Sequence, residues 1–141
     1  MKKKIFGLLT ACLAVMMFVQ VPFTYAKNNA DTIWSWGFGS FSGARYTEAR
    51  EKHDDTSIYF YVERFETTNG KMRISVVDEN RNQFSYTKVQ EVIEPGMYCL
   101  SSYAYEDRGY GVKVRVRGDR IGQTSINANG VWSPDSYGCW E

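Results

Sequence analysis

The stretch that decides the fold is Tyr110-Gly-Val-Lys-Val-Arg-Val-Arg117, in which apolar and basic side chains alternate strictly. A period of two places successive side chains on opposite faces of a β-strand, so one face is apolar and the other is charged. The inward set is Val112, Val114 and Val116, and the outward set is Lys113, Arg115 and Arg117. This segment therefore predicts a half-buried strand that carries a basic stripe on its outer face.

The same alternation recurs on both sides of this strand. Residues 57–65 and 71–78 each place apolar side chains at every second position, and the Asn69-Gly70 pair between them is typical of a tight hairpin turn. Shorter extended segments are expected at 84–88, 89–94, 97–105 and 130–132, and only 46–54 has a helical composition. Six to seven short strands separated by frequent turns predict an all-β protein, an antiparallel β-sandwich or a small barrel.

The chain has 141 residues, of which 43% are hydrophobic and 16% aromatic, so it is long enough for one domain. Aromatic residues at this frequency argue against intrinsic disorder. We find no internal repeat and no low-complexity segment. We expect residues 27–32 to form a flexible N-terminal entry and residues 33–141 to form a single β domain.

The first 26 residues have the pattern of a cleaved signal helix. Lys2, Lys3 and Lys4 precede a long apolar run, and Thr24-Tyr25-Ala26 places small residues where a signal peptidase cuts. The protein is therefore expected to be secreted. A retained membrane anchor is one alternative. A lipoprotein is another, because Leu9-Thr10-Ala11-Cys12 resembles a lipobox in which Cys12 is acylated.

Charge and composition exclude several classes of function. Removal of three lysines with the signal peptide lowers the formal charge from +1 to −2, which argues against a nucleic-acid partner. A single histidine excludes a His-rich metal site. Asp78, Asn80 and Asn82 match the start of a calcium loop, but Gln83 and Val89 replace its glycine and glutamate. We expect no metal and no cofactor.

Two cysteines, Cys99 and Cys139, remain in the mature chain. In an exported protein such an isolated pair is most simply read as one disulfide, which would hold the C-terminal end against the body. Two free thiols are the alternative, because the sequence does not give the distance between the two Cα atoms.

Three segments together resemble a group of small, secreted, uncharacterised proteins of Gram-positive bacteria. They are Gly43-Ala-Arg-Tyr-Thr47, Lys52-His-Asp-Asp-Thr-Ser57 and the closing Gly130-Val-Trp-Ser-Pro-Asp-Ser136. The closing segment is the specific one. The chain is also similar to lactococcin-type β-sandwich bacteriocins, which carry a Gly-x-Trp element near their ends, although it differs from them in length and in its cysteine pair. Neither resemblance implies catalytic residues.

His53, followed by Asp54 and Asp55, is the one place where a histidine adjoins carboxylates in the sequence. A hydrolase would also need an activated nucleophile, and neither Gly-x-Ser-x-Gly nor a Cys-His signature is present. A solvated loop that leads into the strand at 57–65 is the simpler interpretation, and we expect no enzymatic activity.

Aromatic pairs spaced two residues apart are the strongest candidates for a binding surface, because on a strand both members share a face. Such rings could stack against sugars or lipid headgroups, or they could fill the core. Trp132 is expected in the core, whereas the Tyr59/Tyr61 face fits either interpretation. The basic stripe is either a contact for anionic polymers or a charged outer face. The paired aromatics are Trp34 and Trp36, Tyr59 and Tyr61, and Tyr103 and Tyr105.

Three functions are consistent with these features. The first is a secreted, non-catalytic module that binds bacterial cell-wall polymer or the membrane surface through the aromatic face and the basic stripe. The second is a bacteriocin-like antibacterial factor, and the third is a small hydrolase built on His53.

Overall fold

The computed structural model describes residues 28–139, and within them it contains nine β-strands and one short helix in two packed antiparallel sheets. The predicted all-β sandwich is confirmed, in its open form rather than as a closed barrel. The elements are β1 (Thr32–Phe38), β2 (Arg45–Tyr46), β3 (Arg50–Lys52), β4 (Ile58–Thr67), β5 (Lys71–Asp78), β6 (Gln90–Val92), β7 (Gly96–Leu100), α2 (Ala104–Arg108), β8 (Val112–Ile121) and β9 (Ile126–Ser133).

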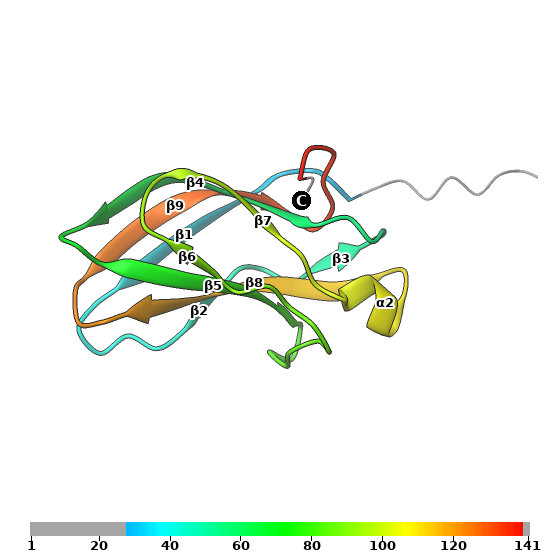
Figure 1. Cartoon of the computed structure of the whole chain (residues 1–141), viewed down its shortest axis with the longest axis horizontal. Helices are drawn as coiled ribbons and strands as arrows, with labels where there is room; N and C mark the ends of the chain where they lie inside the picture. The colour runs from blue at the N-terminus through cyan, green and yellow to red at the C-terminus, as the bar shows by residue number, and fades with distance from the viewer. Residues whose placement is uncertain (1–27, 140–141) are drawn as a thin grey trace, which may run out of the picture.

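The two sheets divide the strands in an order that differs from the order in the chain. The four-stranded sheet runs β1-β9-β4-β7, and the five-stranded sheet runs β2-β8-β5-β6 with β3 also paired to β8. In Figure 1, β1, β9 and β4 lie along the upper side of the molecule, and β2, β8 and β5 lie along the lower side. Helix α2 and the C-terminal tail lie toward the same end of the sandwich.

The core fills the space between the sheets with the inward face of each strand. Val112, Val114 and Val116 of β8 point into it, as their alternation predicts, and Trp132 is fully buried. Trp36 crosses from the four-stranded sheet to lie on the backbone of Gly118, where an added Cβ would come within 2.4 Å of the indole ring. The absence of a side chain at position 118 therefore lets the two sheets approach at this point.

The Asn69-Gly70 turn does not close a hairpin, contrary to the prediction. It joins β4 to β5, and these strands belong to different sheets. The turn is therefore a corner between the layers, with Asn69 at a φ of 63°. Gly70 is needed because an added Cβ would lie 2.2 Å from the hydroxyl oxygen of Thr67, which accepts a hydrogen bond from the Gly70 N–H.

The segment 46–54 is extended rather than helical. The backbone of Thr47 donates to the Val116 carbonyl at 3.0 Å, and its hydroxyl accepts from the Val116 N–H at 2.9 Å, so β2 and β3 both lie along β8. The strand predicted over 97–105 forms as β7 but ends at Leu100, and the helix begins at Ala104 as α2. At 46–54, pairing with β8 therefore overrides the local helical propensity.

The N-terminal entry makes hydrogen bonds to the body of the domain at Asn28. The Asn28 N–H donates to Asp135 at 2.7 Å, its side-chain amide donates to the Glu51 carbonyl at 2.6 Å, and β1 already begins at Thr32.

The predicted signal peptide and Cys12 lie outside the described residues. Within residues 28–139 no helix is long and apolar enough to cross a membrane.

Candidate functional site

An exposed apolar row crosses the outer face of the four-stranded sheet. The strand register aligns Ile33 of β1, Val131 of β9, Tyr61 of β4 and Met97 of β7 on one line. Ile33 is 83% exposed, Met97 57% and Tyr61 38%. We call these four residues the apolar row. They point outward because their neighbours in the chain, such as Trp34 and Trp132, fill the core with the opposite face of the same strands.

A second row, parallel to the first and two residues further along the strands, is polar. It consists of Ser35, Asn129 and Arg64, aligned across β1, β9 and β4. We call it the polar row. Next to it lies a pocket of about 380 Å³ lined by Glu63, Arg64, Phe65, Pro95 and Asn129. The side-chain oxygen Oδ1 of Asn129 is buried and has no hydrogen-bond partner in the structure.

A β-bulge in β4 positions the residues that line this pocket. The register of β4 against β9 shifts between Val62 and Arg64, so Glu63 is the extra residue and the strand turns Arg64 toward Asn129. The backbones approach so closely here that a Cβ on Gly130 would lie 1.9 Å from the Tyr61 carbonyl oxygen. The glycine of the Gly130-Val-Trp132 segment is therefore required by backbone contact with the bulged strand.

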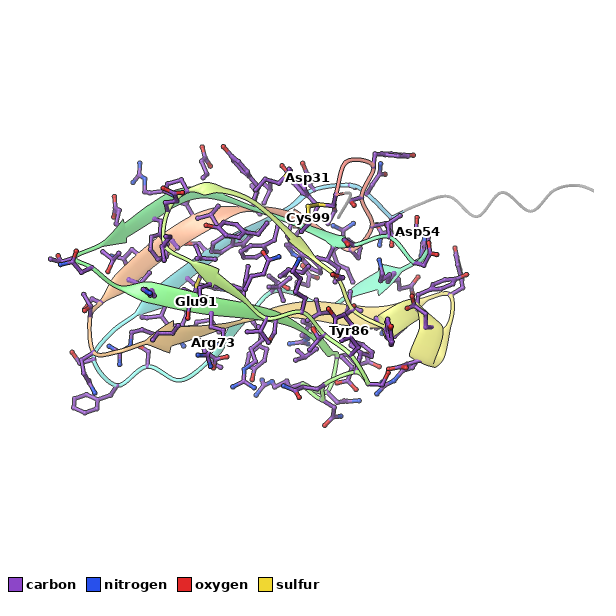
Figure 2. The ribbon with its side chains drawn as sticks, viewed as in Figure 1. Asp31, Asp54, Arg73, Tyr86, Glu91 and Cys99 are labelled. Atoms are coloured by element: carbon purple, nitrogen blue, oxygen red, sulfur yellow. A yellow bond between two sulfur atoms is a disulfide. The ribbon has the colours of Figure 1, made fainter. Side chains whose placement is uncertain are left out.

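Tyr59 lies beside the disulfide at the other side of the apolar row. It pairs with Cys99, which is bonded to Cys139 across a Cα–Cα distance of 5.3 Å, so the predicted disulfide is confirmed. Burial raises the pKa of the Tyr59 hydroxyl, and the nearby Asp31 carboxylate adds to the effect. Figure 2 shows Asp31 and Cys99 on the side of the four-stranded sheet, with Arg73 and Tyr86 on the opposite side.

Trp34 and Trp36 are not part of a binding surface, and this prediction is wrong. Both are almost fully buried, and their ring centroids lie 4.6 Å apart, with Trp34 stacked on Phe60 at 4.5 Å. The Trp34 indole N–H also reaches the Tyr61 and Val131 carbonyls, at 3.3 Å each. The two tryptophans share a face as predicted, but that face is the core.

Tyr103 and Tyr105 do not form a pair on a strand, because the chain enters α2 between them. Tyr103 instead contacts Tyr86 with a centroid distance of 5.0 Å, and it is half exposed, whereas Tyr105 is partly buried. These rings belong to the end of the sandwich near α2. They contribute nothing to the apolar row.

The basic stripe of Lys113, Arg115 and Arg117 does lie on the outer face of β8, as predicted, but it is partly neutralised. Arg117 makes an ion pair with Asp119 at 2.7 Å, and Lys113 lies 3.4 Å from Glu79. The stripe is on the five-stranded sheet, which faces away from the apolar row. The aromatic face and the basic stripe therefore cannot form a single contact surface.

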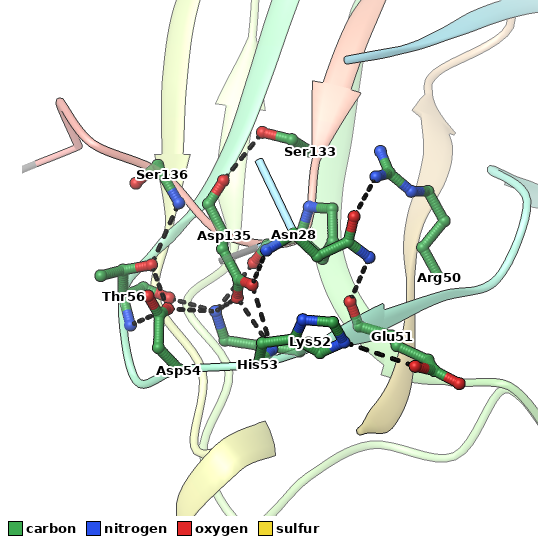
Figure 3. A network of polar contacts seen from close by, with 11 residues as sticks. Asn28, Arg50, Glu51, Lys52, His53, Asp54, Thr56, Ser133, Asp135 and Ser136 are labelled. Atoms are coloured by element: carbon green, nitrogen blue, oxygen red, sulfur yellow. Dashed lines mark hydrogen bonds and ion pairs between the residues drawn. The ribbon is translucent and has the colours of Figure 1, made fainter. Parts of the chain in front are cut away.

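A buried ion pair joins two of the segments that carry the family resemblance. Lys52 lies 3.2 Å from Asp135, and their side chains are 1% and 0% exposed. The Lys52 ammonium also donates to the carbonyls of Thr56 and Pro134, and Asp135 accepts from the backbone N–H groups of Asn28 and His53 (Figure 3). All three ammonium protons are thus directed to oxygen acceptors.

This network acts as a structural clasp. Burial lowers the pKa of Lys52, and the Asp135 carboxylate works against that effect. The ammonium has three oxygen acceptors, one for each of its protons. The clasp holds the N-terminal entry, the loop after β3 and the closing segment together at one end of the sandwich.

The His53 ring contacts Glu51 and Tyr110. Its Nε2 is 3.3 Å from a Glu51 carboxylate oxygen, and the ring stacks on Tyr110 at 4.4 Å. Asp54 accepts a hydrogen bond from the Thr56 N–H at 3.0 Å and caps the loop. These contacts of His53 and Asp54 hold the loop after β3 in its conformation.

Sequence reasoning missed most of the residues that frame this surface. Ile33, Met97 and Asn129 belong to strands whose partners are distant in the chain, so no local pattern joins them. The Lys52–Asp135 pair spans 83 positions. The one available signal was the presence of both residues within the segments that carry the resemblance.

A fold of this kind, with one disulfide and a mixed outer face, defines a small β-sandwich domain. The family described as "Protein of unknown function (DUF2712)" matches residues 22–136, so the chain belongs to that family. Neither the curated proteins nor the solved structures gave a significant match.

Proposed function

We propose that this protein is a secreted, non-catalytic binding module that attaches to bacterial cell-envelope components through the outer face of its four-stranded sheet. The observation that supports the proposal is the apolar row of Ile33, Val131, Tyr61 and Met97. Three of these side chains are solvent-exposed, and all four are in register across four strands. Contiguous exposed apolar side chains are typical of interaction sites.

The contrast with the other sheet strengthens this choice. The outward positions of β8 carry three basic side chains followed by the acidic residue Asp119, and together they form a surface suited to water. The outward positions of the four-stranded sheet instead present apolar side chains beside a pocket. Burial of the apolar row against a partner would be favourable at roughly 25 cal/mol per Å² of apolar surface.

The test is co-sedimentation of residues 27–141 with washed bacterial cells and with isolated wall sacculi. We expect retention on the wall material, and we expect Tyr61→Ala combined with Met97→Ala to weaken it at least tenfold. Phe41→Ser is the matched control, because Phe41 is fully exposed in a loop outside the row. No retention on either material would overturn the proposal, and so would retention that is unchanged in the double variant.

A further inference from the structure

We propose that the pocket beside the apolar row binds an N-acetylated hexose unit of an envelope glycan. This inference rests on the proposed function and names the ligand of that face. The geometry that carries it is the parallel placement of two different rows: Tyr61 and Val131 in the apolar row, and Asn129 and Arg64 in the polar row.

The spacing of the rows suits one sugar ring. Tyr61 of β4 pairs with Val131 of β9, so Tyr61 and Asn129 occupy diagonal positions on neighbouring strands, which are about 7–8 Å apart. A hexose ring that lies on Tyr61 therefore extends toward Asn129. Aromatic side chains stack against the C–H face of a sugar, and a partly exposed tyrosine on a rigid strand offers that surface without rearrangement. Tyr61 is anchored by the pairing of β4 with β9 and β7 on its two sides.

The polar groups fit an acetamido substituent. Asn129 lines the pocket, and its Oδ1 is turned inward, where it is buried without a hydrogen-bond partner. Rotation of the amide toward the pocket would let Oδ1 accept a hydrogen bond from a ligand N–H or O–H, a contact that it lacks in its buried position. An acetamido N–H supplies that donor, and its methyl group then lies toward Val131 of the same strand. Glu63 and Arg64 at the pocket wall offer an acceptor and a donor to the ring hydroxyls.

Other ligand classes fit the site less well. Asp31, Glu63 and Glu66 outnumber Arg64 on this face, and Arg64 is already paired with Glu66 at 3.5 Å, so the face would repel an anionic lipid surface or a polyphosphate. A peptide that added as a further strand beside β1 would need to form hydrogen bonds with the unpaired backbone carbonyl groups at that edge. Arg45 already donates to the Gly37 carbonyl at 3.1 Å, and Arg50 donates to the Ala30 carbonyl. A neutral glycan needs neither positive charge nor a free sheet edge.

The experiment is a titration of the folded protein with the β-1,4-linked tetramer of N-acetylglucosamine, followed by two-dimensional NMR. We expect saturable shifts of the Tyr61, Asn129 and Val131 amides and at least fivefold weaker binding of the β-1,4-linked glucose tetramer, which is also neutral but lacks the acetamido groups. Asn129→Ala is expected to weaken binding at least fivefold. Its matched control is Asn127→Ala, one exposed position further along the same face of β9. Tyr61→Phe should retain binding, whereas Tyr61→Ala should lose it.

The outcomes separate this inference from the proposed function. Retention on sacculi without any tetramer binding, or tetramer binding that is unchanged in Asn129→Ala, overturns the inference and leaves envelope binding in place. If analytical ultracentrifugation finds a dimer that Tyr61→Ala dissociates, the face is a contact between two copies and the inference fails. If the protein binds neither sacculi nor tetramer, both proposals fail.

Discussion

At the scale of single residues, the Lys52–Asp135 pair shows how a buried charge is tolerated in a small domain. Two side chains with almost no exposure would be costly to bury alone. Here the ammonium has three acceptors, and the carboxylate receives hydrogen bonds from two backbone N–H groups. The pair stabilises the fold by connecting chain segments that are far apart in sequence.

Replacement of one member of this pair should strongly destabilise the fold. Lys52→Met leaves the buried Asp135 carboxylate without its cation, and we expect the free energy of unfolding to fall by about 3–5 kcal/mol in urea titrations. Lys71→Met is the control, because Lys71 forms an exposed ion pair with Glu91 at 3.4 Å and should cost less than about 1 kcal/mol. Equal losses for the two variants would contradict the assignment of a clasp.

Gly130 provides a second prediction at this scale. An added Cβ would collide with the Tyr61 carbonyl oxygen, so Gly130→Ala must push β9 away from the bulge of β4. We expect a loss of more than about 2 kcal/mol of unfolding free energy, as is typical when a backbone contact is strained. Gly43→Ala is the control, because nothing lies within 4 Å of a Cβ there. A stable Gly130→Ala variant would show that the two backbones can separate without cost.

At the scale of elements, the C-terminal tail after β9 depends on two attachments. Asp135 anchors its start in the clasp, and the Cys99–Cys139 bond fixes its end to β7. The tail therefore lies against the strand that carries Met97, at the border of the proposed binding face.

Removal of the disulfide should lower stability without changing the architecture. The bond closes a loop with a sequence separation of 40, for which the chain-entropy model gives about 3–4 kcal/mol. We expect this loss for the Cys99→Ser/Cys139→Ser variant in urea unfolding, while its circular dichroism spectrum remains that of a β protein. The wild type under reducing conditions should match the variant, and a loss below about 1 kcal/mol would contradict the prediction.

The turn that follows β5 gives a prediction on pH. Burial opposes ionisation of Asp78, but hydrogen bonds from Asn82 and the Arg108 guanidinium outweigh it and hold the pKa of this carboxyl below its ordinary value. A lowered folded-state pKa stabilises the protein above the ordinary pKa, and the contribution disappears as the pH falls through the lowered value.

Asp78→Asn should therefore flatten the acid side of the stability profile. We expect the unfolding free energy of the variant to change less than that of the wild type between about pH 6 and about pH 3. Asp55→Asn serves as the control, because Asp55 is exposed in the loop after β3 and should leave the slope unchanged. Identical slopes for Asp78→Asn and the wild type would contradict the role of the Asn82 and Arg108 contacts.

At the scale of the whole molecule, the sandwich presents two outer faces of different character. One carries the apolar row and the pocket, and the other carries the basic stripe with its paired acids. A flat ligand surface contacts one of these faces at a time, since the faces point in opposite directions.

The salt dependence of envelope binding distinguishes the two faces. Binding through the apolar row should change less than about twofold when salt rises to about 0.5 M, because the Debye screening that weakens charge contacts leaves apolar burial intact. Lys113→Gln combined with Arg115→Gln should likewise leave retention on sacculi unchanged. A steep loss with salt, matched by the loss in that double variant, would place the contact on the basic stripe instead.

The sequence by itself determined the local features of this protein. The period of two in 110–117 and 57–65 is a property of neighbouring residues, so it fixed which side chains share a face, and Trp132 and the three valines of β8 are buried as expected. The cysteine pair is also bonded as expected. These predictions hold because the pleat of a strand and the burial of apolar surface require no knowledge of the partner strand.

Only the tertiary structure decided the features that depend on partners. Alternation shows that Trp34 and Trp36 share a face, but the pairing of β1 with β9 decides that this face is the core and that Ile33 is outside. Tertiary pairing also decides that β4 and β5 belong to different sheets. It likewise brings Lys52 into contact with Asp135. The physical reason is that strand pairing is non-local, so the sequence encodes the faces of each strand but not their neighbours.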